Sequence, residues 1–254
     1  MIDLHCHLLP GVDDGSRSVD QSARVLTAMA AGGVTDVVLT PHLDASRISE
    51  GPPPGHDEAF AQLSKAVPPG IRLHRGAEVM LDRAFTPRAV STRRITLAHS
   101  RYVLVEFTRL VAASGAQQAL SQVVKSGLVP LLAHPERYAI CSPAEVRGWR
   151  ALGVAIQVDA NTVFMPTGRG ARARALLEEG LADVLAADNH GDSRSLVEPY
   201  AKLIACGGAA SAEFLMKRNP AAILADQPLE PVPPIEVKLS LFKRIKGWVD
   251  EMGQ

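Results

Sequence analysis

The first fifteen residues, Met-Ile-Asp-Leu-His-Cys-His-Leu-Leu-Pro-Gly-Val-Asp-Asp-Gly (1–15), place two histidines at the end of a short apolar segment. Side chains alternate between the two faces of a β-strand, so His5 and His7 point to one side while Cys6 points to the other. Two imidazoles on one face of a strand end supply half of a metal site. The stretch therefore predicts a first strand that delivers metal ligands to one edge of a sheet.

Other residues of the metal-ligating types stand just past further apolar runs, and five of the eight histidines of the chain occupy such positions. The carboxyl ends of parallel strands meet at one edge of a sheet or barrel, so residues more than a hundred positions apart can share one pocket there. The candidates beyond the first strand are Asp13 or Asp14, His42, Glu78, His134, Asp188 and His190.

Short apolar runs alternate with helical patterns over most of the chain, which is typical of a parallel α/β fold. Seven strand–helix units favour closure into a barrel over an open sheet. The predicted strands are Ile2–Leu4, Asp36–Leu39, Ile71–Arg75, Tyr102–Glu106, Val129–Ala133, Val154–Val158 and Asp183–Ala186. The predicted helices are Val19–Ala31, His56–Ala66, Ala116–Ser126, Pro143–Leu152, Gly170–Glu179, Leu196–Cys206 and Ala212–Lys217.

Composition excludes several classes of protein. The 27 basic and 27 acidic residues balance, so the chain has no broad positive surface for nucleic acid. Three cysteines do not suggest a disulfide framework. The N-terminus does not read as a signal peptide, and no apolar run is long enough for a membrane span. We expect a soluble, cytoplasmic protein.

The last 28 residues differ from the rest. Four prolines between positions 228 and 234 indicate an extended linker. Beyond them, apolar residues at helical spacing share the segment with Lys243, Arg244 and Lys246. We therefore expect a catalytic barrel over residues 1–226 and a linker with a basic amphipathic tail over 227–254. The tail either packs back on the barrel or makes a weak contact with a partner or an anionic membrane surface.

The ligand types indicate the chemistry. Histidine nitrogen and carboxylate oxygen without thiolate suit Zn, Mn or Fe, and the ligands are too many for one ion, so two or three ions are expected. Glu78 is the best candidate to bridge two of them. Paired ions can hold a hydroxide that attacks a phosphoester. Arg137 and Arg194, which follow His134 and His190 closely, offer the planar donor groups that bind phosphate oxygens.

These motifs resemble those of the PHP (polymerase and histidinol phosphatase) superfamily. They are most similar to the bacterial metal-dependent protein-tyrosine phosphatases of capsular and exopolysaccharide synthesis. The resemblance covers almost the whole chain. The segments that carry it are residues 1–15, Thr40-Pro41-His42, Gly76-Ala77-Glu78, Ser100–Phe107, Ala133–Arg137, Asp188–His190 and Asn219-Pro220-Ala221, followed by the proline-rich and basic tail.

The resemblance implies a distorted seven-stranded (β/α) barrel with three metal ions. Among the candidate metals, Mn is the one we expect to support activity. It implies that a metal-bridging hydroxide hydrolyses phosphotyrosine on an autophosphorylating tyrosine kinase that regulates polysaccharide synthesis. The implied ligands are His5, His7, Glu78 and Asp188 for the first ion, Glu78 and His134 for the second, and Asp14, His42 and His190 for the third.

Two ligand positions stay open. Asp13 competes with Asp14 in the first loop. PHP proteins often use a further histidine on the second ion, and His99, just before the strand Tyr102–Glu106, is the candidate by position. His99 is equally compatible with a loop residue outside the site.

Three other functions compete with this interpretation. Cys141 and Arg147 have the C-x5-R spacing of cysteine phosphatases, but the loop between them has no glycine and contains a proline and a glutamate. A PHP enzyme could instead hydrolyse a small phosphate monoester such as histidinol phosphate, or act as a nuclease. A non-catalytic binding module with structural metals is the third alternative, although two arginines beside the ligands argue against it.

Overall fold

The computed structural model describes residues 1–83 and 93–239 of the 254-residue chain. The predicted amphipathic segment beyond residue 239 lies outside the described residues. Within the described ranges, no helix combines the length and the apolar character needed to cross a membrane.

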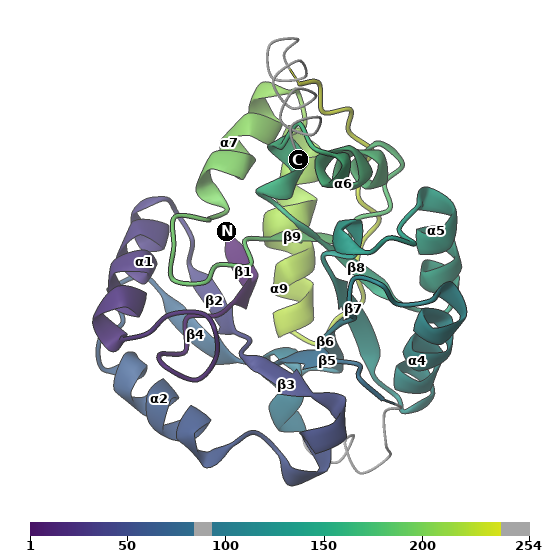
Figure 1. The fold of residues 1–254 in the computed structure, drawn as a ribbon. Coiled ribbons are helices and arrows are strands. Elements are labelled where there is room, and N and C mark those ends of the chain that lie inside the picture. The colour runs from purple at the N-terminus through teal and green to yellow at the C-terminus, as the bar shows by residue number, and fades with distance from the viewer. Residues whose placement is uncertain (84–92, 240–254) are drawn as a thin grey trace, which may run out of the picture.

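Parallel strands lie at the centre of the molecule, and helices surround them (Figure 1). The strands are β1 (Ile2–Cys6), β2 (Asp36–Leu39), β3 (His42–Asp44), β4 (Arg72–Arg75), β5 (Glu78–Met80), β6 (Tyr102–Glu106), β7 (Val129–Ala133), β8 (Ala155–Asp159) and β9 (Val184–Ala186). The α-helices are α1 (Val19–Ala31), α2 (Pro54–Ser64), α4 (Ala113–Lys125), α5 (Pro143–Ala151), α6 (Gly168–Glu178), α7 (Val197–Ala205), α8 (Ala209–Glu213) and α9 (Asn219–Leu224).

Short helical turns follow several strand ends and continue α8. They are the 3-10 helices η1 (Ala45–Glu50), η2 (Arg93–Ile95), η3 (Leu97–His99), η4 (Pro135–Arg137) and η5 (Thr162–Phe164), and the π-helix η6 (Phe214–Arg218).

The predicted parallel α/β fold is confirmed, but the structure contains two short strands that were not predicted. They are β3 and β5, which come just after the predicted strands Asp36–Leu39 and Ile71–Arg75. The hydrogen-bonded order is β1-β2-β4 in one sheet and β3-β5-β6-β7-β8-β9 in the other, and every pair is parallel. Pro41 lacks an N–H for the ladder and separates β2 from β3. Gly76 separates β4 from β5 at a point where a Cβ would lie 2.9 Å from Leu97 Cδ2. The sequence predicted one seven-stranded barrel, whereas the described strands form two parallel sheets, of three and six strands.

The first and last strands meet through a few contacts rather than a long ladder. Cys6 and Asn189 form an isolated parallel bridge, and the His7 N–H donates to the Asn189 carbonyl at 2.7 Å. The buried carboxylate of Asp3 accepts the N–H of Ala187 at 3.1 Å. These bonds bring the residues after β9 beside the end of β1, which is where the sequence expects metal ligands.

Three clusters of buried apolar side chains hold the layers together. One lies between β1, β2 and β4 and the helices α1 and α2, and another lies between the larger sheet and α4 to α7. The third lies inside the strands, where Leu4, Val38, Leu104 and Leu131 meet Ile223 of α9. Side chains on opposite faces of one strand thus enter different clusters, as strand alternation requires.

Helix boundaries follow from local capping. Ser18 Oγ accepts the N–H of Gln21 before α1, and Ser142 Oγ accepts the N–H of Glu145 before α5. Pro143 occupies the first turn of α5, where its missing N–H costs no helical hydrogen bond.

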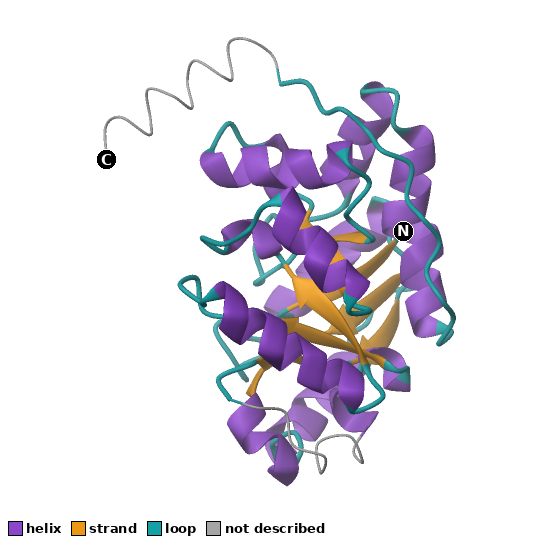
Figure 2. Cartoon of the chain, turned by 90° about the vertical axis from the view of Figure 1, so that its right-hand side faces the viewer, coloured by secondary structure: helices purple, strands orange, loops and turns teal. Residues whose placement is uncertain are grey.

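Residues 227–239 follow the last helix as an extended segment that runs along the outside of the helices (Figure 2). The N–H of Ile235 donates to the Leu177 carbonyl at 3.0 Å, and Ser211 Oγ donates to the Pro233 carbonyl at 2.9 Å. Val232, Ile235 and Val237 are buried. This part of the proline-rich region is therefore packed on α6 and α8.

Asp36 provides a test of the sheet formed by β1, β2 and β4. Burial alone would raise its pKa, but hydrogen bonds from Arg72, His74 and Thr35 lower it to about 2. A lowered pKa adds stability above pH ~4, and that stability is lost as the pH falls toward 2. We expect Asp36→Asn to reduce the free energy of unfolding at pH 7 by about 1–2 kcal/mol, less than the full shift because Arg72 is largely exposed.

Denaturant unfolding at pH 7 and near pH 3.5 measures this effect. The difference in free energy of unfolding between Asp36→Asn and the parent protein should be smaller at the lower pH. Asp20→Asn, which removes an exposed carboxylate on α1, is the control and should change stability little. If Asp36→Asn loses the same stability at both pH values, the charge of Asp36 is not the cause of the loss.

Candidate metal centre

Glu78, the first residue of β5, lies at the centre of a cluster of histidines. Its side chain is 1 % exposed, and its Oε2 lies 3.1 Å from His5 Nε2, 3.2 Å from His7 Nε2 and 3.2 Å from His42 Nδ1. Its other oxygen, Oε1, lies 3.0 Å from His134 Nε2. One carboxylate thus faces four imidazoles that come from three other strand ends, as expected of a bridging ligand.

The first group of donor atoms combines the end of β1 with the residues after β9. Nε2 of His5 and Nε2 of His7 are 3.1 Å apart, and Asp188 Oδ1 lies 3.3 Å and 3.5 Å from them. All three side chains are buried. These three residues form one set of converging donor atoms, and Glu78 Oε2 lies within 3.2 Å of both histidine nitrogens. Nitrogen and oxygen donors of this kind suit a divalent transition metal.

The second group contains a residue that the sequence analysis did not select. Glu106 ends β6, and its Oε1 lies 3.1 Å from His42 Nδ1 while its Oε2 lies 4.0 Å from His134 Nε2. It joins Glu78 and His42 in one set of converging donor atoms, beside the set formed by His5, Glu78 and His134. Its position at the carboxyl end of a predicted strand was the signal that could have identified it.

The third group opens toward solvent. His42 Nε2 lies 3.4 Å from Asp14 Oδ1, and His190 Nε2 lies 3.5 Å from the same oxygen. His7 completes the set, and its ring stacks on that of His190 with centroids 4.1 Å apart. The side chain of Asp14 is 69 % exposed, so this group forms the outer edge of the centre.

Two histidines are oriented by hydrogen bonds to their second ring nitrogen. His5 Nδ1 lies 3.0 Å from Gln157 Oε1, and His7 Nδ1 lies 2.8 Å from Asp13 Oδ2. Gln157 Oε1 and the Asp13 carboxylate accept the ring protons, which leaves each Nε2 as a lone pair facing the cluster. The structure therefore separates the two candidate acids of the first loop, since Asp13 holds a histidine and Asp14 faces the outer group.

This arrangement fits metal ions better than internal hydrogen bonding. Glu78 Oε2 is buried and has no hydrogen-bond donor among the described residues. The neighbouring Nε2 atoms of His5 and His7 also present lone pairs, because their ring protons are on Nδ1. Lone pairs that converge in a buried space repel one another unless a cation lies between them. The donor atoms thus fit a group of bound cations.

The electrostatics of the cluster agree with this conclusion. Burial alone would lower the pKa of His5, but the carboxylates of Glu78 and Asp188 raise it to about 9. Burial alone would likewise raise the pKa of Glu78, but the surrounding histidines hold it well below its ordinary value. Positive charge is therefore strongly favoured among these side chains, whether protons or metal ions provide it.

The backbone is strained where two of these side chains enter the cluster. His134 has φ +32° and Asp188 has φ +49°, in the left-handed region that side chains with a Cβ rarely occupy. Such conformations cost about 1–3 kcal/mol each and concentrate at functional sites. His134 directly follows β7, and Asp188 is the second residue after β9, so both turns lie at the edge of the sheet.

Both predicted phosphate-binding arginines lie at this centre. Arg137 Nη2 forms ion pairs with Asp188 Oδ2 and, at 3.2 Å, with Asp159 Oδ2. Arg194 Nη1 lies 3.5 Å from Asp188 Oδ2, and its Nη2 lies 2.8 Å from Asp192. The two guanidinium groups thus approach the same oxygen of a candidate ligand from outside the cluster.

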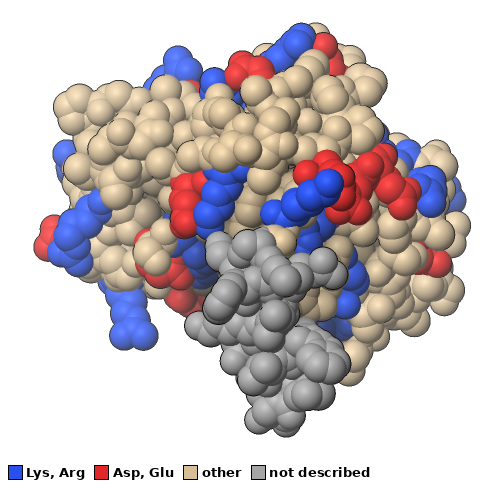
Figure 3. Space-filling view, turned by 90° about the horizontal axis from the view of Figure 1, so that it is seen from above, with Lys and Arg blue, Asp and Glu red and all other residues tan. Residues whose placement is uncertain are grey.

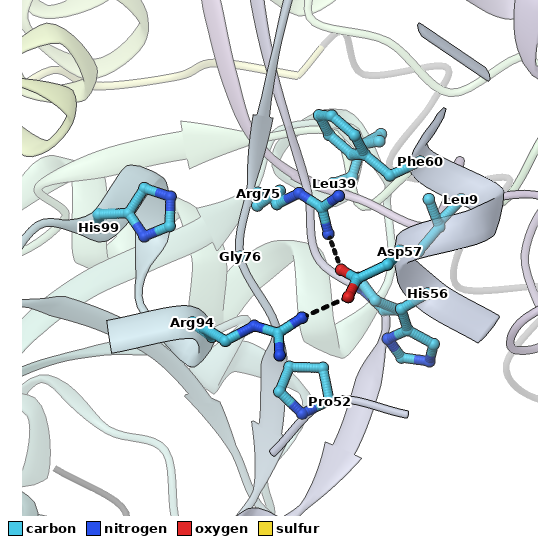
Figure 4. Close-up of a pocket in the computed structure, with 11 residues that line it drawn as sticks. Leu9, Leu39, Pro52, His56, Asp57, Phe60, Arg75, Gly76, Arg94 and His99 are labelled. Carbon is cyan, nitrogen blue, oxygen red and sulfur yellow. Dashed lines mark hydrogen bonds and ion pairs between the residues drawn. The ribbon is translucent and has the colours of Figure 1, made fainter. Parts of the chain in front are cut away.

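His99 lies elsewhere in the described structure. It belongs to none of the converging donor sets found among the described residues. It instead lines a cavity of about 280 Å³ beside β4 and α2, across from Asp57, Arg75 and Arg94 (Figure 4). The carboxylate of Asp57 accepts hydrogen bonds from both arginines at 2.6 Å.

The cysteine alternative has no support in this geometry. Cys6 is fully buried and points away from the histidines, as strand alternation predicts. Burial raises the pKa of Cys141 to about 12, so its thiol does not ionise near neutral pH. Arg147 forms an ion pair with Glu179. The C-x5-R spacing is therefore a coincidence of sequence.

Fold and site together define a class: parallel α/β proteins with converging His and carboxylate side chains, suited to metal binding, at the carboxyl ends of their strands. D-hydantoinase shares the fold at a TM-score of 0.54 and 15 % identity, over 91 % of this chain and 72 % of that enzyme. Residues 1–225 match the model of the family described as capsular polysaccharide synthesis, CpsB/CapC. The chain belongs to that family, and the resemblance inferred from its motifs is confirmed.

Two curated relatives are similar over nearly their whole length. The tyrosine-protein phosphatase CpsB of Streptococcus pneumoniae is 31 % identical over 89 % of this chain and 99 % of that protein. The tyrosine-protein phosphatase YwqE of Bacillus subtilis is 26 % identical over 94 % and 97 %. A solved structure from work on YwqE and CpsB, described as unique metal-dependent tyrosine phosphatases, has a TM-score of 0.76 at 22 % identity, over 94 % of this chain and 100 % of that one.

Glu106 offers a test of the second donor group. We expect Glu106→Ala to lower the metal content by about one ion per chain, because the variant removes one of the three residues in this donor set. Plasma mass spectrometry after metal loading and desalting measures the stoichiometry. Glu58→Ala, an exposed change on α2, is the control. A folded Glu106→Ala protein with unchanged metal content would show that Glu106 is not a ligand.

Proposed function

We propose that this protein is a metal-dependent protein-tyrosine phosphatase. The observation that carries the proposal is the convergence of four imidazoles on the buried carboxylate of Glu78, with two arginines at the edge of the same cluster. Membership of the CpsB/CapC family and the curated names of its relatives support the same activity.

Three ions would share these donor atoms. We assign His5, His7, Glu78 and Asp188 to the first ion, and Asp14, His42 and His190 to the third. Glu78 and His134 would hold the second ion, together with Glu106, whose Oε2 lies 4.0 Å from His134 Nε2 and whose Oε1 faces His42. His99 receives no ligand role in this assignment. Bound divalent ions at such a centre supply Lewis-acid activation of water near neutral pH and neutralise charge on phosphate oxygens. We favour Mn, with Fe and Zn as alternatives, since nitrogen and oxygen donors suit all three.

The side chains around the ions would orient the substrate. Arg137 and Arg194 present planar donor groups, which bind two phosphate oxygens at once better than a lysine does. Asp188 holds both arginines through Oδ2 while its Oδ1 faces the histidines. One carboxylate thus fixes the distance between the metal centre and the phosphate-binding groups, and the open outer group leaves a path for a substrate.

Several further properties belong to this proposal. The seven strand-forming regions would act as one distorted seven-stranded barrel, residues 1–226 as the catalytic unit and 227–254 as linker and tail. The tail would make a weak contact with a partner or a membrane surface. We place the protein in the cytoplasm, where its substrate would be an autophosphorylating tyrosine kinase of capsular or exopolysaccharide synthesis. Hydrolysis of a small monoester such as histidinol phosphate is the alternative, and the curated relatives do not favour it.

A comparison of substrates tests the activity. The metal-reconstituted protein is assayed with a phosphotyrosine peptide, a phosphoserine peptide and histidinol phosphate under the same conditions. We expect kcat/KM for the phosphotyrosine peptide to exceed both others by at least about tenfold, and a chelator to abolish turnover. Preferential turnover of histidinol phosphate would replace this function by the alternative.

Arg137 provides a second test. We expect Arg137→Ala to lower kcat/KM for phosphotyrosine peptide by about 100-fold or more, because a charged donor to the phosphate is lost. Metal content should be kept, since the arginine supplies no ligand atom. Steady-state kinetics and metal analysis of the same preparation measure both. Normal kinetics would leave Arg137 with a structural role only.

A further inference from the structure

Arginines gather beside Arg137 in a cluster that the proposed reaction does not require. The cluster consists of Arg109, Arg169 and Arg172, and we call it the arginine rim. Its members follow β6 and β8, on either side of the strand that leads to Arg137. The rim therefore lies at the carboxyl end of the sheet, on the side of the metal centre that bears Arg137.

Backbone and side-chain contacts fix this arrangement. Arg169 and Arg172 are three residues apart on α6 and so share a face of the helix. Arg172 Nε donates to the Glu136 carbonyl at 2.8 Å, so that face meets η4. From the other side, the carbonyl of Arg109 accepts the N–H of Ala139 at 3.2 Å, just after η4.

The positive charges of the rim are not neutralised within the described structure. No carboxylate there forms an ion pair with Arg109, Arg169 or Arg172. The nearby carboxyl of Glu136 is fully buried and accepts the N–H of Asp159 at 3.0 Å, so it faces inward. Arg109 is exposed and Arg169 half-buried.

Arginines elsewhere commonly have acidic partners. Arg147 pairs with Glu179, and Arg218 lies 2.6 Å from Glu230. On the face seen in Figure 3, several Lys and Arg side chains likewise lie next to Asp and Glu. The rim differs from these pairs, because its three arginines lie near one another and have no acidic partner among the described residues.

These charges are close enough to repel one another. Burial and the charges of Arg109, Arg137 and Arg172 lower the pKa of Arg169. Repulsion of this kind destabilises the free protein and is relieved when an anion binds. The rim is thus suited to an anionic ligand that lies beside the phosphate held by Arg137.

We propose that the arginine rim binds anionic side chains that flank the phosphotyrosine of the protein substrate. This inference rests on the proposed function and specifies its substrate class. A residue of extended chain spans ~3.3 Å, so side chains one to three positions from the phosphotyrosine reach ~10 Å from it. Carboxylates and a second phosphotyrosine share the required charge, and both match the fork of an arginine.

Three phosphotyrosine peptides of equal length test the proposal, with neutral flanks, with glutamate flanks and with a second phosphotyrosine. We expect the metal-loaded parent protein to prefer both anionic peptides over the neutral one by about tenfold in kcat/KM, and added salt to reduce this preference. In Arg109→Ala/Arg169→Ala, the preference should fall to about twofold or less. Arg109→Lys/Arg169→Lys should keep most of it, because the charge remains.

The matched control is Arg147→Ala/Arg218→Ala, which removes the same charge from arginines that have acidic partners. Arg147 pairs with Glu179, at the opposite end of α6 from Arg169. This control should prefer the anionic peptides over the neutral peptide as strongly as the parent protein does. If only the peptide with a second phosphotyrosine is preferred, the rim binds phosphate. If both anionic peptides are preferred equally, the rim binds either kind of negative charge.

Two results would overturn the proposal: a parent protein without preference, or a preference that survives in Arg109→Ala/Arg169→Ala. A different result would contradict the proposed function itself. If the metal-loaded protein hydrolyses neither a small aryl phosphate nor any of the peptides, it is not a tyrosine phosphatase. Fluorescence anisotropy of the labelled peptides then decides whether the rim discriminates between them.

Discussion

The buried carboxylate of Glu78 is the constraint on which the rest of this structure depends. It stands at a break between β4 and β5 and faces imidazoles from three other strand ends. Such a carboxylate is costly to bury unless cations surround it. The bonds that join β1 to the residues after β9 also bring Asp188 to the same point, so a cation held by Glu78 would lie at that junction.

Hydrophobic alternation was sufficient to predict most of the architecture. Three strands, Asp36–Leu39, Tyr102–Glu106 and Val129–Ala133, and the helix Val19–Ala31 have the predicted bounds. β3 and β5 were missed because each has only three residues and neither forms an apolar run of its own after Pro41 or Gly76-Ala77. Such short strands form because neighbouring strands offer hydrogen bonds to them, and the periodicity of the sequence carries no signal of that pairing.

Candidate ligands could be identified where a polar residue follows an apolar run, as at His134 and Asp188. Glu106 obeys the same rule, because it is the last residue of the predicted strand Tyr102–Glu106. His99 was a candidate because PHP proteins often use a further histidine on the second ion, and in the structure it lines a different cavity. The roles of Asp13 and Asp14 depend on which carboxylate turns toward His7, and only three-dimensional geometry separates two adjacent acids in a loop.

Anomalous X-ray scattering from crystals of the manganese-loaded protein, collected at the manganese absorption edge, tests the central claim most directly. We predict peaks within metal–ligand distance of Glu78, one between Oε2 and the Nε2 atoms of His5 and His7, and one between Oε1 and His134. A third peak is expected near Asp14, His42 and His190. A map with no peak beside Glu78, from protein that carries manganese elsewhere, would contradict the account.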